Sequence, residues 1–281
     1  MTSSSQRTPE EKLDAILRWW PEHLELPILG EELNGFVSEL VVKVFVEVDG
    51  QWMPMVAKIS DEKDLFAAAA EVRLMRNWAN HGLAPTVFGK FGRMTLLEWV
   101  DARPVDLNHL KEATVALRRC HELSITGLAP LEVLLDKRYG ALANAGSGNS
   151  HDSVVMRDAK AILAGMGDCN PVPLHGDCHP RNVLFNGKKI FMIDPLGASG
   201  DRCFDIAMLA VTSGGEPYAT LGAMRRWYGN DVDTLGAWFA WCAAFRYRVE
   251  RNSRPKVAKV LGGVIQKLSE DRRWCGGFYE I

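Results

Sequence analysis

The chain has 281 residues, of which 47% are hydrophobic and 24% charged, and its formal net charge is −2. This composition is typical of a globular protein and the length allows two parts with separate cores. The slightly negative charge argues against nucleic acid as a main partner, because such proteins usually present a basic face. The six scattered cysteines form no C-x-x-C pair, and no apolar signal region or membrane-spanning run is present, so a reduced, cytoplasmic protein is expected.

The N-terminal part is predicted to hold one helix and a small antiparallel sheet. Residues 8–11 (T-P-E-E) have the pattern of a capping box with proline at the first helical position, and apolar residues follow at helical spacing. Residues 40–48 and 53–59 then read as two strands, separated by the hairpin signal Asp49-Gly50. The segment 34–39, just ahead of these strands, could bind a phosphate through backbone N–H groups and the Ser38 hydroxyl, but an ordinary hairpin turn remains open.

Lys58 lies near the end of the second strand, in a context close to the V-A-I-K sequence around the phosphate-binding lysine of kinases. The following segment, 64–78, is predicted to be a helix in which Glu71 shares one face with apolar residues. A carboxylate on an inward face is costly unless a cation meets it. The sequence therefore predicts an ion pair between Lys58 and Glu71, the alternative being that Glu71 reaches solvent.

The stretch 173–197 contains the most informative pattern. Two short apolar runs separated by Asn186-Gly187 predict a hairpin with a tight turn. Asp177 and Asn182 lie before this hairpin and Asp194 lies after it, so folding should bring all three to the same end. The interval from Asp177 to Asn182 matches the D-x-x-x-x-N spacing of a kinase catalytic loop, and an amide oxygen with a carboxylate suits Mg²⁺.

The motifs H-G-D at 175–177, H-P-R-N at 179–182 and I-D-P at 193–195 resemble the signature of the aminoglycoside phosphotransferase and choline kinase-like family. Together with residues 196–207, the stretch most resembles the streptomycin 6-phosphotransferase branch. The resemblance implies a two-lobed, protein kinase-like α/β (α+β) fold. Its N-terminal lobe, an antiparallel sheet plus helix over residues 1–100, would bind nucleotide, and its mostly helical lobe, residues 101–281, would hold the catalytic and acceptor sites.

The implied reaction moves the γ-phosphate of ATP, or GTP, to a hydroxyl of a small molecule, with Mg²⁺ as cofactor. An aminoglycoside or aminocyclitol antibiotic is the expected acceptor, and a sugar or a choline-like amino alcohol is the alternative; the oligomeric state is open. By resemblance, Asp177 would deprotonate the acceptor, and Asn182 and Asp194 would hold the metal. Lys58, fixed by Glu71, would contact the α- and β-phosphates.

Two further features follow from the same resemblance. The strand at 94–101 is expected to be the hinge, where the Glu98 carbonyl and the Val100 amide bind adenine. Asp205 is expected to support the metal loop and to have a structural role.

The C-terminal part is predicted to contain helices over 232–249 and 255–268, and the Gly-, Ser- and Asn-rich segment 140–153 is predicted to be a loop. The basic run from Arg246 to Arg273 is expected to be a solvated helix face. The acceptor could meet either of two sets of side chains. An aromatic cage for a quaternary ammonium would come from Trp238, Trp241, Trp274 and Tyr279. An acidic wall would come from Asp201, Glu216, Asp231, Asp233, Glu270 and the terminal carboxylate.

An alternative from another class uses the same loop. In an extended segment, His175, Asp177 and His179 point to one face at period two and could bind a catalytic transition metal. The sequence therefore leaves a metal-dependent hydrolase as a second hypothesis.

Overall fold

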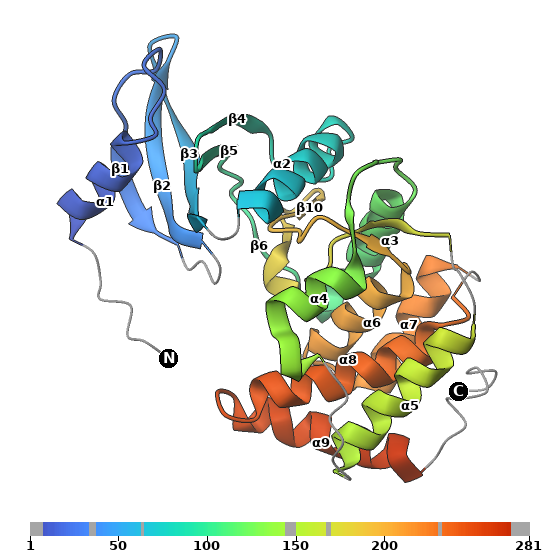
Figure 1. Cartoon of the computed structure of the whole chain (residues 1–281). Helices are drawn as coiled ribbons and strands as arrows, with labels where there is room; N and C mark the ends of the chain where they lie inside the picture. Colours follow the sequence, from blue (N-terminus) through green and yellow to red (C-terminus); the bar gives the residue numbers. More distant parts are fainter. Residues whose placement is uncertain are drawn as a thin grey trace. The chain divides into compact units, whose positions relative to one another are not determined.

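The computed structural model describes residues 8–33, 38–62, 65–143, 150–166, 170–229 and 232–270. The chain divides into two compact units, Met1–Asp101 and Ala102–Ile281. Figure 1 shows the first unit as a sheet accompanied by helices α1 and α2 and the second as a mostly helical body.

The first unit is built on a five-stranded sheet in the order β1-β2-β3-β5-β4, with every neighbouring pair antiparallel. Its elements, in chain order, are α1 (Pro9–Leu17), β1 (Ile28–Glu32), β2 (Ser38–Val48), β3 (Gln51–Ser60), α2 (Leu65–Asn80), β4 (Val87–Phe91) and β5 (Met94–Glu98).

Local sequence explains why these elements form where they do. The predicted capping box is present at α1, where Glu11 N–H donates to the Thr8 hydroxyl oxygen and Thr8 N–H donates to the Glu11 carboxylate. Asp49 and Gly50 both have positive φ angles, +52° and +76°, which is the geometry that a two-residue hairpin turn needs. Alternate residues of β2 enter the core, and Ile16 of α1 packs against them.

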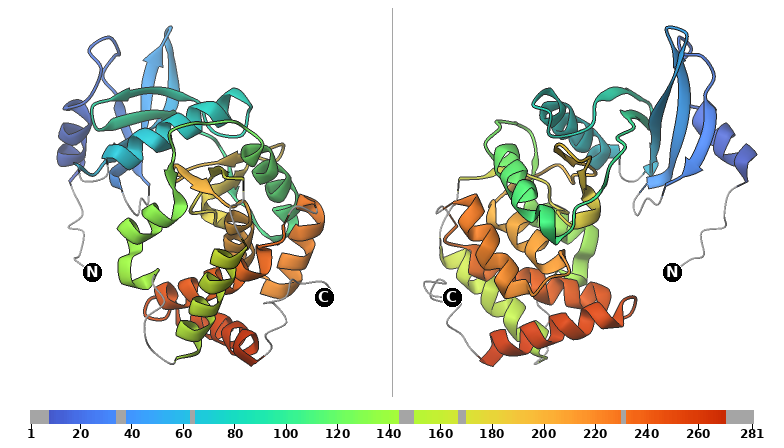
Figure 2. Two further views of the ribbon diagram at one scale, coloured as in Figure 1. Left: turned by 45° about the vertical axis from the view of Figure 1, so that its right-hand side comes forward. Right: turned by 180° about the vertical axis from the view of Figure 1, so that it is seen from behind.

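The second unit contains seven α-helices among the described residues: α3 (Leu110–His121), α4 (Leu131–Tyr139), α5 (His151–Gly165), α6 (Cys203–Thr212), α7 (Pro217–Tyr228), α8 (Leu235–Glu250) and α9 (Pro255–Glu270). Helix α8 packs against α5, α6 and α9, as the views of Figure 2 also show. It is buried along most of its length, with Phe239 and Trp241 at its centre.

Two small sheets accompany these helices. One has the order β10-β9-β6 and the other β7-β11-β8. Their strands are β6 (Arg103–Pro104), β7 (Ala129–Pro130), β8 (Val172–Leu174), β9 (Val183–Phe185), β10 (Ile190–Met192) and β11 (Ala198–Gly200). The short helix η4 (Pro180–Asn182) lies between β8 and β9 and forms part of the predicted catalytic loop.

The predicted architecture of an antiparallel sheet followed by a mostly helical part is confirmed. The predicted helices at 232–249 and 255–268 correspond to α8 and α9. The prediction of a loop over 140–153 is wrong at both ends, because a short helical turn covers Gly140–Leu142 and α5 begins at His151; residues 144–149 lie outside the described part. Within that part, no helix is both long and apolar enough to cross a membrane.

Candidate active site

The predicted hairpin is present as β9 and β10, with Val183 paired to Met192 and Phe185 to Ile190. Its turn differs from the expected two-residue type. Of the turn residues, only Gly187 has a positive φ, +88°. The side-chain oxygen of Asn186 accepts hydrogen bonds from the N–H groups of Lys188 and Lys189, both at 3.0 Å. The asparagine therefore closes a longer turn with its side chain instead of adopting a left-handed backbone.

The hairpin brings Asp177, Asn182 and Asp194 to the same end. The side-chain amide of Asn182 donates to the Asp177 carbonyl oxygen at 3.1 Å. The N–H of Ile193, the residue before Asp194, donates to the Asn182 carbonyl oxygen at 3.0 Å. The side chain of Asn182 is largely buried, whereas the Asp177 carboxylate retains 19% exposure. The arrangement sets two carboxylates and one amide around the entrance and exit of the hairpin.

Asp194 has an unusual backbone conformation, with a φ of +54° in the left-handed region. Residues other than glycine pay roughly 1–3 kcal/mol for such a conformation and keep it where the surroundings impose it. Here the contacts on either side do so. The His175 Nε2 atom donates to the Ile193 carbonyl oxygen at 2.9 Å, and Leu196 N–H donates to the His175 carbonyl oxygen at 2.7 Å. Strain held in this way is typical of functional positions.

Asp205, at the start of α6, fixes the loop that carries Asp177. Its fully buried carboxylate accepts hydrogen bonds from the N–H groups of His175 (2.7 Å) and Gly176 (2.9 Å), and it lies 3.0 Å from His121 Nε2. Gly176 has a φ of +77°, and a Cβ there would come within 2.9 Å of Leu196 Cβ. The loop therefore needs both a glycine and a buried acceptor to reach its observed path.

The histidines of the loop do not form a metal site. His175 uses both ring nitrogens, because Nε2 donates to the Ile193 carbonyl oxygen and Nδ1 accepts the Asp177 N–H at 3.3 Å. Among the described residues, no group of three histidine, cysteine, aspartate or glutamate side chains is arranged to hold a metal. The hypothesis of a hydrolase metal bound by His175, Asp177 and His179 is therefore not supported by the geometry of His175.

His179 is neutral near pH 7. Burial lowers its pKa from 6.5 to about 4, and this effect outweighs the attraction of Asp177, whose Oδ2 lies 3.9 Å from His179 Nε2. The imidazole and the carboxylate therefore form no ion pair at neutral pH.

This lowered pKa predicts a pH dependence of stability. Between pH 6.5 and about 4 the unfolded chain protonates His179 while the folded chain does not, so lowering the pH should destabilise the fold. The free energy of unfolding should fall by up to ~3 kcal/mol, because a difference of one pKa unit between the folded and unfolded chain corresponds to about 1.36 kcal/mol. Urea unfolding at pH 7.0 and pH 4.5 would measure it. The variant His179→Gln should lose less free energy of unfolding over that interval, and an equal loss would contradict the assignment.

In the first unit, Lys58 of β3 and Glu71 of α2 form the predicted ion pair, with Nζ and Oε1 2.6 Å apart. Their side chains are only 11% and 15% exposed. Lys58 lies on a central strand, opposite Val41 of β2 and Thr95 of β5. The pair therefore fixes the lysine side chain at a mostly buried position between the sheet and α2.

The other residues predicted to bind nucleotide are Ser38, Glu98 and Val100. Ser38 is the first residue of β2, but its side chain and residues 34–37 lie outside the described part of the chain. Glu98 ends β5, where its carboxylate accepts from the N–H and hydroxyl of Thr86 at 2.9 and 2.8 Å. Val100 is half-buried just beyond that strand. The predicted adenine contacts of Glu98 and Val100 involve backbone atoms and stay a prediction.

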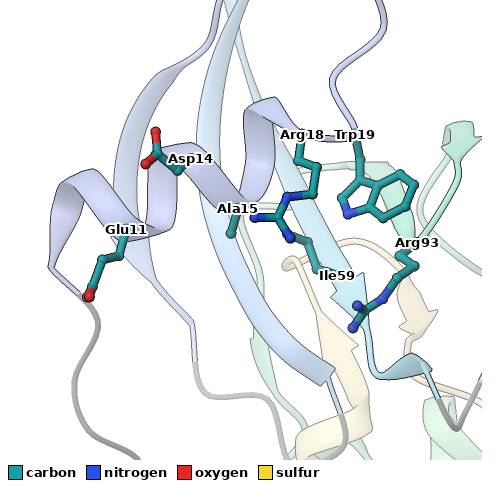
Figure 3. Close-up of a pocket in the computed structure, with 7 residues that line it drawn as sticks. All are labelled: Glu11, Asp14, Ala15, Arg18, Trp19, Ile59 and Arg93. Atoms are coloured by element: carbon teal, nitrogen blue, oxygen red, sulfur yellow. The ribbon is translucent and has the colours of Figure 1, made fainter.

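A cavity of about 270 Å³ lies in the first unit beside α1 (Figure 3). Arg18, Trp19 and Arg93 are among its lining residues, and Arg93 Nε donates to the Ser60 carbonyl oxygen at 2.9 Å. None of the predicted site residues lines it. We therefore do not assign this cavity to the reaction.

A larger cavity of about 380 Å³ lies in the second unit, next to the predicted catalytic loop. His179 and Arg181 of the loop form one wall, and residues of α6, α7, α8 and α9 form the others. Sequence reasoning missed this cavity, because its walls combine segments that are far apart in the chain. The expected solvated face is also wrong at Arg246, whose side chain is only 12% exposed and lines the cavity.

Neither predicted set of acceptor-binding side chains is found there. Trp238 and Trp241 are core residues, 6% and 2% exposed, that pack edge to face with each other. The Asp201 carboxylate accepts from Trp238 Nε1 and Cys203 N–H, and Glu216 caps α7 through the Ala219 N–H. The remaining members, Asp233 and Glu270, do not line the cavity, and Asp231, Trp274, Tyr279 and the C-terminus lie outside the described residues.

Comparison with known proteins gives a consistent picture. The model of a family described as "Phosphotransferase enzyme family" matches residues 40–239. Comparison with curated protein sequences finds no significant match. Solved structures of the same fold include a choline/ethanolamine kinase family protein from Mesorhizobium loti, with 17% identity, a TM-score of 0.62 and coverage of 88% of this chain and 90% of that one.

Two others are similar over nearly their whole length. A putative fructosamine-3-kinase from Thermobifida fusca has 21% identity and a TM-score of 0.56, with coverage of 94% of this chain and 98% of that one. A spectinomycin phosphotransferase, solved with ADP and spectinomycin, has 11% identity and a TM-score of 0.57, with coverage of 96% and 99%. The predicted kinase-like fold is thereby confirmed.

Proposed function

Because the chain belongs to the phosphotransferase enzyme family, we propose that its active site transfers the γ-phosphate of ATP to a hydroxyl of a small molecule with the help of Mg²⁺. The observation that supports this most directly is the placement of Asp177, Asn182 and Asp194 at one end of a hairpin. Phosphoryl transfer depends mainly on positioning and on charge stabilisation, and these three side chains, held at one end of a hairpin, would contribute to both.

Asp177 is the proposed catalytic residue. Its backbone is fixed at both ends, because its N–H donates to His175 Nδ1 and its carbonyl oxygen accepts from Asn182. The carboxylate is partly exposed and is the charged partner of a neutral His179. It can therefore orient an acceptor hydroxyl by accepting its hydrogen bond and then take its proton as the new P–O bond forms.

Asn182 and Asp194 are the proposed metal ligands, and their chemistry fits Mg²⁺. The amide nitrogen of Asn182 donates to Asp177, which leaves the amide oxygen as the atom that can meet a cation. An amide oxygen and a carboxylate are hard ligands of the kind that Mg²⁺ takes together with phosphate oxygens. Bound there, the cation would offset the charge of the β- and γ-phosphates.

Lys58, held by Glu71, is proposed to contact the α- and β-phosphates. The same proposal includes the Ser38 hydroxyl as a phosphate contact, and the Glu98 carbonyl and Val100 amide as adenine contacts. The ADP in the structure of the spectinomycin phosphotransferase supports an adenine nucleotide over GTP as the donor.

The acceptor is less constrained than the reaction. The resemblance to the streptomycin 6-phosphotransferase branch favours an aminocyclitol antibiotic, and the kinases of similar fold favour a sugar or an amino alcohol. The motifs behind the resemblance lie in 175–207, and of these only the loop residues 179–181 also line the larger cavity. Motif resemblance therefore supports the chemistry more strongly than the identity of the acceptor.

The proposal predicts ADP release that depends on both Mg²⁺ and a hydroxylated acceptor. A panel of aminocyclitols, sugars, amino alcohols and hydroxy acids would be screened, with mass spectrometry of the product to detect the added phosphoryl group. Asp177→Asn should lower kcat about 100-fold, the lower range for a general base, and leave the KM for ATP nearly unchanged. Turnover by Asp177→Asn equal to that of the parent protein would contradict the proposal. The absence of both ATP-dependent phosphorylation of every acceptor tested and slow ATP hydrolysis would also contradict it.

A further inference from the structure

The cavity beside the catalytic loop is strongly basic. Among the described residues that line it, four side chains are cationic, namely Arg181, Arg246, Arg254 and Lys256, and one, Glu250, is acidic. His179 also lines it, and its Nε2 lies 3.9 Å from the Asp177 carboxylate, so the cavity adjoins the proposed catalytic base. A ligand in this cavity would therefore meet an excess of positive charge close to the reacting group.

The single acid does not offset this charge, because it is already shared. Glu250 is almost completely buried, with a side chain that is 2% exposed, and it forms ion pairs with both Arg246 and Arg254. Two guanidinium groups thus surround one carboxylate and leave a net positive charge. Lys256 of α9 adds to it.

Two polar atoms at the cavity lack a protein partner. Among the described residues, the buried Nε–H of Arg246 donates no hydrogen bond, and the buried Nδ1 of His179 takes part in none. A guanidinium N–H in this state is costly unless a ligand satisfies it, and an anionic oxygen is its strongest acceptor. The lowered pKa of His179 fits the same charge distribution: burial is its largest cause, and Arg181 and Arg246 act in the same direction.

The rest of the wall is apolar. Several aliphatic residues line it, and two of them, Val257 and Val260, are 38% and 55% exposed. The apolar lining includes Pro180, Val211, Pro217, Val257, Val260 and Leu261. The cavity therefore offers one basic region and one apolar region.

Resting on the proposed phosphotransferase function, we propose that the acceptor is an acid: a small hydroxylated molecule whose carboxylate or phosphate group binds Arg246, Arg254 and Lys256 while its body lies on the apolar wall. A cationic acceptor, such as an aminoglycoside or a choline-like amino alcohol, would instead bring ammonium groups next to several guanidinium groups. The members of the predicted aromatic cage and of the predicted acidic wall that the structure describes do not line this cavity.

Calorimetric titration of the full-length protein with two matched sets of probes tests this proposal. The first set is 3-phenyllactate, 3-phenyllactamide and phenylalaninol, which share an aromatic body and a hydroxyl but differ in charge. The second is glucose 6-phosphate, glucose and glucosamine. In at least one set, the anion should bind ~10-fold or more tightly than the neutral and cationic members, and added salt should reduce the difference. Preferred binding of 3-phenyllactate would indicate a carboxylate, and preferred binding of glucose 6-phosphate would indicate a phosphate.

Two lysines of α9 provide a matched pair of variants. Lys256 and Lys259 are both exposed, but only Lys256 lines the cavity. Lys256→Gln should weaken binding of the anionic probe at least ~5-fold, whereas Lys259→Gln should leave it unchanged. Equal effects of the two substitutions, tighter binding of the cationic probes, or no binding of either anion at millimolar concentration would overturn the proposal.

Failure of this inference is distinguishable from failure of the proposed function. If the protein phosphorylates neutral or cationic acceptors and prefers them to acids, the anionic acceptor is wrong and the phosphotransferase assignment stands. If anions bind at the cavity as expected but no ATP-dependent phosphorylation occurs with any acceptor, the site is assigned correctly and the proposed reaction is wrong.

Discussion

Replacing Asp194 with asparagine should lower kcat at least ~1000-fold, because the variant removes the only carboxylate proposed to hold the metal. The choice of asparagine follows from the backbone. Asp194 has a φ of +54°, a conformation that asparagine and glycine tolerate better than alanine does. Asp194→Ala would add backbone strain to the loss of charge, so its loss of activity would have two causes.

The matched comparison is Asp194→Gly. Glycine relieves the strain of the left-handed conformation, so this variant should lose activity as severely as Asp194→Asn while its free energy of unfolding stays near that of the parent. Both variants should bind Mg²⁺ together with ATP more weakly, which titration of Mg²⁺ in the presence of nucleotide would show. Turnover by Asp194→Asn within tenfold of the parent would remove Asp194 from the metal site.

The parts of the site that sequence predicts well are those built from neighbouring residues. The hairpin follows from two apolar runs and a turn signal, and the spacing of Asp177 and Asn182 is fixed within a single loop. The Lys58 and Glu71 pair spans only thirteen residues and follows from a charge placed on an apolar helix face. Periodicity and local turn chemistry are sufficient for such features, because the interacting groups belong to consecutive elements.

The proposed acceptor cavity could not be predicted in that way. Arg246 and Arg254 lie in a sequence run that has the composition of a solvated face, and only the packing of α8 and α9 turns them toward the loop that carries His179. The positions of Trp238 and Trp241 agree with their spacing. Aromatic residues at helical spacing belong more often to a core than to a cage for a cation, and the structure places both in the core of the second unit.

The conformation of the catalytic loop likewise depends on a long-range contact. Asp205 accepts hydrogen bonds from residues twenty-nine and thirty positions earlier in the chain, and from His121, which is eighty-four positions away. The sequence indicates a structural aspartate at this position by resemblance, but no local pattern shows which donors it serves. The structure identifies those donors, and their number and burial allow the loss of stability on removal of Asp205 to be predicted.

Asp205→Ala should destabilise the protein by about 3–5 kcal/mol, which is the cost of removing the acceptor from a buried polar network. The substitution leaves the N–H groups of His175 and Gly176 and the ring of His121 without this partner in a site that solvent does not reach. Asp205→Asn should cost less, because one carbonyl oxygen remains, but its NH₂ group must then face one of the two backbone N–H donors. Glu112→Ala, at an exposed position of α3, is the control and should change stability by less than about 0.5 kcal/mol.

Urea unfolding of these variants, followed by circular dichroism, measures the three free energies, and a cycle with His121→Ala separates the contribution of the histidine from that of the backbone donors. The cycle should show a coupling energy of at least ~1 kcal/mol between Asp205 and His121, with Asp205→Ala still costly when His121 is absent, because the two backbone donors remain unpaired. A cost below about 1 kcal/mol for Asp205→Ala would mean that water or a neighbouring group satisfies those donors. In that case the loop would not depend on Asp205 for its conformation, and the placement of Asp177 would need another explanation.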